Sequence, residues 1–238
     1  MALRSYREEN KTAAVRTMFN AIAPRYDFLN HLLSFGTDFR WRRKAIDLLK
    51  PLHPQRILDV GTGTADFAIE ALRLRPLEVV GVDIAEEMLK LGNEKLRERN
   101  LNGVVRLEVG NAERLQFADG SFDAVTVAFG VRNFENLELG LAEMCRVLKP
   151  GGAALILEFS SPKAFPFRHI YGFYFSKILP LVGGAISRNR DAYQYLPQSV
   201  EGFSDGEGFL KLLKKVGFTG AQQFSLTFGI ASIYLAFK

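Results

Sequence analysis

The middle third of the chain alternates short runs of β-branched and apolar residues with helical stretches, and this alternation restricts the fold more than any other feature. We expect strands at 56–60, 78–83, 104–109, 122–129 and 153–159, and helices at 64–74, 86–100 and 137–148. Strands that alternate with helices form βαβ units, whose right-handed crossovers produce a mostly parallel sheet. Two more strands, at 222–226 and 230–237, predict an α/β fold with a doubly wound, Rossmann-like, seven-stranded sheet.

The two ends of the chain interrupt this alternation. Helices are expected at 7–19, 41–49 and 206–216, while 161–200 is rich in Phe, Tyr, Pro and Gly. Ligands bind beyond the carboxyl ends of the strands in such sheets, so the segments before and after the core are natural walls for a site. We expect a single domain over 1–238, with a helical lid (1–50), a cofactor-binding core (51–160), an acceptor-side insertion (161–200) and a C-terminal helix and strands (201–238).

A glycine-rich loop, Asp59-Val-Gly-Thr-Gly-Thr-Ala-Asp66, follows the first expected strand. Gly61 and Gly63 permit a tight turn and the close approach of a ligand. Asp83 ends the second strand, where a carboxylate can accept hydrogen bonds from both ribose hydroxyls of an adenosine. A dinucleotide site requires Gly-x-Gly-x-x-Gly, because the helix N-terminus receives a pyrophosphate, but the third position here is Asp66. The acidic Asp59 and Asp66 favour S-adenosylmethionine, a cation without phosphate, over NAD.

Charge is distributed unevenly along the chain. The net charge of +5 would by itself suggest nucleic acid. Residues 1–56 carry 11 basic and 5 acidic groups, 57–159 carry 11 and 17, and 160–238 carry 9 and 4. The acidic middle suits a cationic methyl donor, and we expect the basic flanks to face anionic lipid headgroups. The single cysteine, Cys145, excludes an intramolecular disulfide and a multi-cysteine metal cluster, and no metal is expected.

Two further segments complete the pattern. Asn111-Ala112 follows the third strand, where an adenine ring would lie and a backbone amide could bond a ring nitrogen. Lys149-Pro-Gly-Gly152 precedes the fifth strand as a structural turn. Together with Asp59-x-Gly-x-Gly and Asp83 at these spacings, they resemble the class I S-adenosylmethionine-dependent methyltransferases.

In that class the end of the fourth strand faces the transferred methyl group. Amine methyltransferases carry an Asn/Asp-Pro-Pro-Tyr-like segment there, whereas this chain has Ala128-Phe-Gly-Val-Arg-Asn133, which argues against N-methylation. Methylation of carbon 5 of pyrimidines uses a cysteine nucleophile. Cys145 lies within an expected helix, away from any strand end, and is expected to pack as a small apolar residue.

Longer segments narrow the resemblance to one family. The segments are Tyr26-Asp-Phe-Leu-Asn-His-Leu-Leu-Ser34 with Trp41-Arg42, Phe129-Gly-Val-Arg-Asn133, Arg146-Val-Leu-Lys-Pro-Gly-Gly-Ala-Ala-Leu-Ile-Leu-Glu-Phe-Ser160 and Asp191-Ala-Tyr-Gln-Tyr-Leu196. They are similar to the signatures of the ubiquinone/menaquinone-biosynthesis C-methyltransferases, from about residue 10 to the C-terminus. Asp38 replaces the His of many ubiquinone-type members, and Ala128 replaces a Ser that contacts the cofactor in some. The family's cofactor positions that match are Thr64, Asp83, Asn111 and Ala112.

The resemblance implies a prenylated hydroquinone acceptor that is methylated on a ring carbon. We expect demethylmenaquinol, because Asp38 replaces the His, with a ubiquinone-pathway benzoquinol as the alternative. An aromatic carbon becomes nucleophilic when the adjacent phenol loses its proton, so the enzyme must orient the ring and assist that loss. Arg132 would stabilise the phenolate or orient a water, Asn133 would fix a ring oxygen, and Tyr26 would pack on the ring or bond to it.

Simpler structural roles compete with these assignments. Arg132 could have no role beyond an ion pair with a carboxylate such as Glu135, and Tyr26 could have no role beyond packing within the lid. His31 and His169 could act as bases, but lone histidines are more often structural, and we expect that role for both.

Because the prenyl tail of the acceptor is insoluble in water, the enzyme must bind the acceptor at a bilayer. Residues 164–181 mix aromatic residues with cations, which suits an interfacial segment or, preferably, a lid or groove for the tail. No secretory signal and no apolar run of about 18 residues is evident, so we expect a cytoplasmic protein that contacts the inner face of the membrane peripherally.

Other functions and assembly states are less favoured or open. An RNA methyltransferase is less favoured, and no nucleic-acid partner is expected, because no separate RNA-binding module is evident. The intact Asp59, Gly61, Gly63 and Asp83 argue against a non-catalytic membrane-binding protein. A homodimer is the default assembly.

Overall fold

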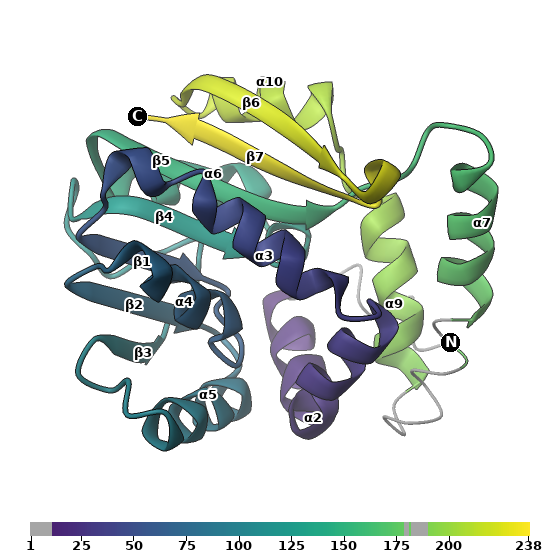
Figure 1. Cartoon of the computed structure of the whole chain (residues 1–238), viewed down its shortest axis with the longest axis horizontal. Helices are drawn as coiled ribbons and strands as arrows, with labels where there is room; N and C mark the ends of the chain where they lie inside the picture. The colour runs from purple at the N-terminus through teal and green to yellow at the C-terminus, as the bar shows by residue number, and fades with distance from the viewer. Residues whose placement is uncertain (1–10, 179–180, 182–189) are drawn as a thin grey trace.

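The strands form one sheet in the order β3-β2-β1-β4-β5-β7-β6 (Figure 1), in a computed structural model that describes residues 11–178, 181 and 190–238. The strands are β1 (Arg56–Val60), β2 (Glu78–Asp83), β3 (Val105–Val109), β4 (Phe122–Ala128), β5 (Leu148–Phe159), β6 (Thr219–Leu226) and β7 (Ala231–Phe237). β1 to β5 pair in parallel, whereas β7 runs antiparallel to both β5 and β6. The predicted seven-stranded, mostly parallel α/β sheet is therefore confirmed.

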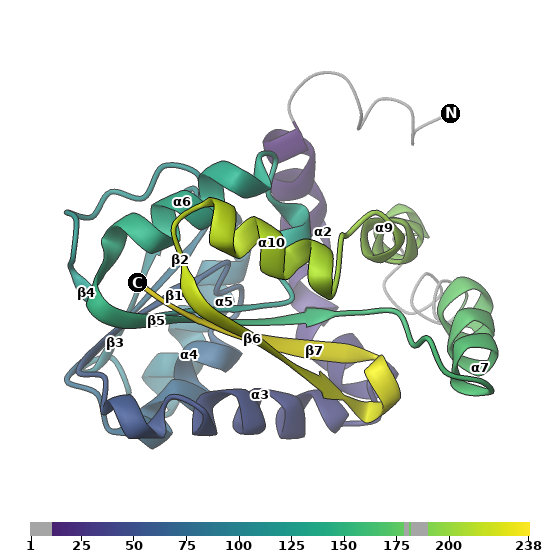
Figure 2. The ribbon, with the colours of Figure 1, turned by 90° about the horizontal axis from the view of Figure 1, so that it is seen from above.

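Helices cover both faces of this sheet (Figure 2). α3 (Thr37–Asp47), α4 (Asp66–Ala71) and α5 (Glu86–Glu98) pack on one face, and α6 (Leu137–Val147) and α10 (Glu207–Lys215) pack on the other. Neighbouring residues of β1 serve opposite cores: Ile57 packs with α3 and α4, whereas Leu58 packs with α6 and α10. Burial on both faces explains why these strands read as nearly continuous apolar runs.

The N-terminal helix is longer than the sequence pattern predicts. α2 (Lys11–Leu33) continues through Pro24, although a proline removes one helical hydrogen bond. Packing offsets that loss, because Met18, Ile22 and Leu29 are buried on one side of the helix. Of the expected helix at 7–19, residues 7–10 lie outside the described part of the chain.

The turn before the fifth strand also differs from expectation. Instead of preceding the strand, Lys149-Pro-Gly-Gly152 lies inside β5, which begins at Leu148. Gly151 has a φ of 78°, and the pairing of β4 with β5 shifts register between Phe122 and Ala124. A bulge of this kind accommodates extra residues without ending the strand.

The remaining helices lie beyond the carboxyl ends of the parallel strands (Figure 1). They are α2, α7 (Phe167–Phe173), a π-helical turn (Tyr174–Ile178) and α9 (Arg190–Glu201). Phe175 and Val200 pack with α2 and with Met88 of α5 in a third apolar core. The two segments expected to form the walls of a site thus pack together. None of the described helices has both the length and the apolar content needed to cross a bilayer.

Candidate active site

The glycine loop and the end of β2 are joined directly. Gly61 and Gly63 adopt left-handed φ angles of 64° and 55°, which favour glycine. The Gly63 N–H donates to Asp83 Oδ2 at 2.8 Å, and the Ala85 N–H donates to Oδ1 at 2.8 Å. Burial raises the pKa of Asp83, against the lowering effect of these backbone donors. The carboxylate is therefore held in one orientation at the carboxyl edge of the sheet.

A cavity of about 80 Å³ opens beside this pair. The predicted cofactor residues that line it are Gly61, Gly63, Asp83, Asn111 and Ala112. Glu113 and Glu135 also line it, and no Lys or Arg of the described residues does. An acidic lining without cations suits a cationic ligand that has no phosphate, so the residues present fit S-adenosylmethionine.

Asp59 lies beneath this cavity and is not part of its lining. Its carboxylate accepts hydrogen bonds from Thr62 Oγ1 at 2.6 Å and Thr126 Oγ1 at 2.7 Å. Burial raises the pKa of Asp59 to about 6, although both hydroxyl donors favour the charged form. Asp59 therefore fixes the glycine loop to β4, and any influence on a cofactor passes through that loop.

Thr64 and Asp66 face a polar cluster under the lid instead of the cavity. Thr64 Oγ1 donates to Asp27 at 2.5 Å, and Lys95 Nζ bridges Asp27 at 2.8 Å and Asp66 at 2.6 Å. His31 Nε2 lies 3.4 Å from Asp66. Despite burial, the hydrogen bond from His31 and the charges of neighbouring cations lower the pKa of Asp66. Asp66 therefore does not line the cofactor cavity, and Lys95 and His31 neutralise its charge.

A second, larger cavity of about 280 Å³ adjoins the first. Phe19, Tyr26 and Phe129 line both cavities, so the two cavities meet at these residues. Most of the other lining side chains are apolar or aromatic, among them Met18, Ile22, Leu33, Phe35, Trp41, Phe159, Tyr171, Tyr174, Phe175 and Leu196. They come from α2, α3, the end of β5, the 171–175 segment and α9, so the lid and the insertion enclose this cavity together.

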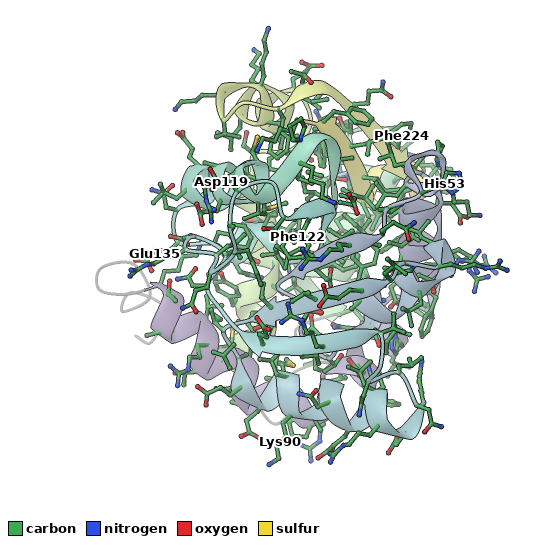
Figure 3. All side chains as sticks on the ribbon, turned by 90° about the vertical axis from the view of Figure 1, so that its left-hand side faces the viewer. His53, Lys90, Asp119, Phe122, Glu135 and Phe224 are labelled. Carbon is green, nitrogen blue, oxygen red and sulfur yellow. The ribbon has the colours of Figure 1, made fainter. Side chains whose placement is uncertain are left out.

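Arg132 lines the larger cavity and forms a buried ion pair. Its Nη1 lies 2.6 Å from Glu158 Oε1, with side-chain exposures of 6% and 0%, and also donates to the Phe129 carbonyl at 2.5 Å. The sequence reasoning missed Glu158, although a lone carboxylate in the apolar run Leu-Ile-Leu-Glu-Phe was a visible signal. Glu135, the partner considered for Arg132, instead accepts from the backbone N–H of Thr12 at 3.1 Å, at the start of α2 (Figure 3).

Asn133 and Tyr26 lie near Arg132. Asn133 Oδ1 accepts a hydrogen bond of 3.1 Å from Tyr195 Oη, and Asn133 lines the smaller cavity. Tyr26 packs edge-on against Phe19, with ring centroids 5.9 Å apart. Burial raises the pKa of Tyr26, against the charge of Arg132 and a hydrogen bond with Asn30. Tyr26 therefore keeps its proton at neutral pH and can donate it to a ligand oxygen.

The two histidines considered as bases lie outside the lining of both cavities. His31 Nδ1 lies 2.7 Å from Asp38, and the hydrogen bond with Asp66 raises its pKa despite partial burial. Two neighbouring carboxylates favour the protonated form of a histidine, which makes it a weaker candidate for a general base. His169 is exposed on α7, edge-on to Phe165.

Comparisons with known proteins agree with this arrangement. The model of the ubiE/COQ5 methyltransferase family matches residues 6–238. The chain is 47% identical over 229 residues to the demethylmenaquinone methyltransferase of Bacteroides fragilis, which covers 96% of this chain and 94% of that protein. It is 48% identical over 235 residues to the ubiquinone/menaquinone biosynthesis C-methyltransferase UbiE of Geobacter sulfurreducens, with 98% and 91% covered.

Solved structures share the fold. A SAM-dependent methyltransferase of Thermotoga maritima aligns with a TM-score of 0.65 at 19% identity, over 94% of this chain and 99% of that one. Phosphoethanolamine N-methyltransferase 2 of Haemonchus contortus, in complex with S-adenosyl-L-methionine, aligns with a TM-score of 0.57 at 18% identity, over 77% and 48%. At these identities the likeness concerns the fold alone. The match to the family model over nearly the whole sequence, together with relatives close to half identical, shows that the chain belongs to the ubiE/COQ5 methyltransferase family.

Proposed function

We propose that this chain transfers a methyl group from S-adenosylmethionine to a ring carbon of a prenylated quinol, converting demethylmenaquinol to menaquinol. The observation that carries the proposal is that an acidic cavity and an aromatic cavity meet at three shared lining residues, Phe19, Tyr26 and Phe129. Reactants held in the two cavities are brought together where the cavities meet, in a fixed orientation, which removes much of the entropic barrier to a bimolecular reaction. The names of the relatives support the quinol as the acceptor.

The smaller cavity would hold the cofactor. Asp83 has both carboxylate oxygens anchored by backbone N–H groups, and each oxygen retains a lone pair for a ribose hydroxyl. Gly61 and Gly63 let the ligand approach the main chain, and Asn111-Ala112 would border the adenine. Asp59 and Thr64 support this site from behind. When bound, S-adenosylmethionine supplies an electrophilic methyl group.

The larger cavity would hold the quinol ring. Arg132 offers a fixed positive charge, because Glu158 and the Phe129 carbonyl restrain its guanidinium. A buried, preorganised cation stabilises a phenolate more than a solvated one can. Tyr26 can donate to a ring oxygen, and Asn133, held by Tyr195, can fix its position. These groups would favour ionisation of the phenol and so raise the electron density of the adjacent carbon.

A membrane surface is the proposed source of the acceptor. Phe35 lines the larger cavity, packs near Tyr174 and is 83% exposed. Phe167 and Phe228 stack with centroids 3.9 Å apart, and Phe165 is 83% exposed. Exposed aromatic side chains of this kind suit the headgroup region of a bilayer. The prenyl tail would remain in the lipid while the ring enters the cavity.

The direct test supplies labelled S-adenosylmethionine with demethylmenaquinol, with the demethylated benzoquinol, or with bulk tRNA. We expect label in the naphthoquinol, with slower labelling of the benzoquinol and none of the tRNA. In a deletion strain, mass spectrometry should show that demethylmenaquinone accumulates. Label that appears in RNA and never in a quinol would refute the proposal.

A further inference from the structure

The larger cavity contains a second polar cluster, on α3, that the proposed chemistry does not use. Arg42 Nη1 pairs with Asp38 Oδ2 within a single turn of the helix. Both residues line the cavity, and they are only 7% and 3% exposed. Ser34 Oγ donates to Asp38 Oδ1 at 2.7 Å, and His31 Nδ1 lies 2.7 Å from Oδ2. Ser34, His31 and Arg42 therefore fix the orientation of the Asp38 carboxylate, and this carboxylate in turn orients the Arg42 guanidinium.

Arg42 has a buried donor without a partner. Its Nε makes no hydrogen bond with any described residue, although it is inaccessible to solvent. A buried, unsatisfied N–H of a charged group costs free energy, so Asp38 alone does not satisfy the hydrogen-bonding capacity of the Arg42 guanidinium. Burial opposes ionisation of Asp38, but the charge of Arg42 and the hydrogen bonds from Ser34 and His31 lower its pKa. Asp38 thus remains an anion that orients Arg42.

The two arginines of the cavity lie over one aromatic floor. The Arg42 guanidinium carbon is 5.7 Å from the centroid of Phe129, and that of Arg132 is 5.4 Å from the centroid of Phe159. The two rings are neighbours, with centroids 4.5 Å apart. A flat ligand beside these rings would share the cavity with two guanidinium groups. A 1,4-dihydroxy ring carries its two oxygens on opposite sides.

We propose that the Arg42 guanidinium binds the second oxygen of the quinol, while Arg132 binds the first, and that Asp38 is the positioning residue for Arg42. This inference rests on the proposed function, because it assumes a dihydroxy aromatic acceptor. It predicts that the cavity distinguishes a ring with two para oxygens from a ring with one.

Trp41 provides a binding assay that does not need turnover. It is the only tryptophan of the chain and lines the same cavity. Quenching of its fluorescence would be titrated, without air, with a prenylated 1,4-naphthohydroquinone and with a prenylated 1-naphthol that lacks the second hydroxyl. A hydrogen bond to a charged group corresponds to roughly a ten- to hundredfold preference. We expect wild type to bind the dihydroxy ligand more tightly by about that factor.

Arg42→Met should abolish the preference by weakening only the dihydroxy ligand. Arg42→Lys keeps the buried charge beside Asp38 but lacks the planar guanidinium with its several N–H donors, so the preference should fall about tenfold even if the Met variant does not fold. Asp38→Asn should reduce it in part. Arg43→Met is the matched control, because Arg43 is an exposed neighbour on the same helix, paired with Glu70, and should leave the preference unchanged. In turnover, Arg42→Met should raise KM for the quinol while the affinity for S-adenosylmethionine is kept.

Equal binding of both ligands by wild type, or no binding of either, would overturn the inference. So would an Arg42→Lys variant that keeps the wild-type preference. Failure of the proposed function has a different signature: wild type would methylate no quinol, whatever its fluorescence titrations show.

Discussion

Arg132 Nη1 and Glu158 Oε1 lie 2.6 Å apart in an ion pair that is almost completely shielded from solvent. The pair joins the short 3-10 turn after β4 (Val131–Asn133) to the end of β5, at the wall of the larger cavity. Desolvating two charges is expensive, and only their mutual attraction and further hydrogen bonds repay it. Burial raises the pKa of Glu158, against the lowering effect of the Arg132 charge. The ionised form of Glu158 therefore depends on this one cation for its stabilisation.

Single and double substitutions of this pair should therefore distinguish its contribution to the free energy of unfolding from its contribution to turnover. Arg132→Ala leaves a buried, unpaired carboxylate and should destabilise the fold by about 3 to 5 kcal/mol at neutral pH. The double variant Arg132→Met with Glu158→Gln should recover most of that stability but no turnover, and S-adenosylmethionine should still bind. Urea denaturation and calorimetry measure the two quantities. Turnover retained by the double variant would remove Arg132 from the mechanism.

Asp83→Asn tests the cofactor cavity. The amide keeps the shape of the carboxylate but replaces one acceptor oxygen with a donor that faces the Gly63 or Ala85 N–H. We expect the affinity for S-adenosylmethionine to fall by roughly ten- to hundredfold in calorimetry. Asp119→Asn is the control, since Asp119 lies on an outer loop of the molecule (Figure 3) and should bind as wild type does. An unchanged affinity in Asp83→Asn would refute the placement of the ribose.

The raised pKa of Asp59 predicts a specific pH dependence of the free energy of unfolding. Its folded pKa is about 6, above the usual value of 3.8, so folding favours the neutral form. The resulting stabilisation is complete below about pH 4 and is lost as the pH rises through 6. The full effect is about 3 kcal/mol by order of magnitude.

In Asp59→Asn this loss should be absent, because the amide stays neutral and can still bond Thr62 and Thr126. The free energy of unfolding, measured in urea from pH 4 to pH 8, should therefore be flatter in the variant than in wild type. S-adenosylmethionine affinity should change less than in Asp83→Asn. Parallel curves for wild type and variant would contradict the assignment.

Lys95 bridges the lid to the glycine-loop helix by contacting Asp27 of α2 and Asp66 of α4. Lys95→Met should leave Asp27 without its cation and Asp66 with His31 alone, and should thereby loosen α2. We expect faster tryptic cleavage at Arg16 and Arg25, and faster dissociation of S-adenosylmethionine in stopped flow. The matched control is Lys90→Met, because Lys90 points outward from the same helix (Figure 3) and its pair with Glu87 is long, at 3.8 Å.

Membrane contact can be tested with vesicles that contain anionic lipid. Phe165→Ser with Phe228→Ser should weaken co-sedimentation, because both side chains are exposed near the insertion. Leu77→Ser is the control. Leu77 is also exposed, but it precedes β2, at the amino-terminal ends of the parallel strands and away from the insertion. A sharp loss of wild-type binding at high salt would support a contribution of the basic flanks. Equal binding by all variants would refute docking through the aromatic residues.

Much of the fold was predictable because its signals are local. The order of strands and helices follows from apolar periodicity, and the φ angles of Gly61 and Gly63 follow from the absence of a side chain. Asp83 could be placed at the cofactor edge, since neighbouring parallel strands end together. The length of α2 could not be predicted, because contacts of Met18 and Leu29 with distant elements outweigh the local break at Pro24.

The sequence by itself determined the sheet and the glycine loop, and it predicted most of the residues that line the proposed cofactor cavity. Only the tertiary structure decided which charges meet. Arg132 pairs with Glu158 and not with Glu135, Lys95 neutralises Asp66, and Asp59 is buried beneath the glycine loop. Charge pairing depends on distance through space, burial and the absence of a competing partner, and these are set only after the lid and the insertion have packed over the carboxyl edge of the sheet.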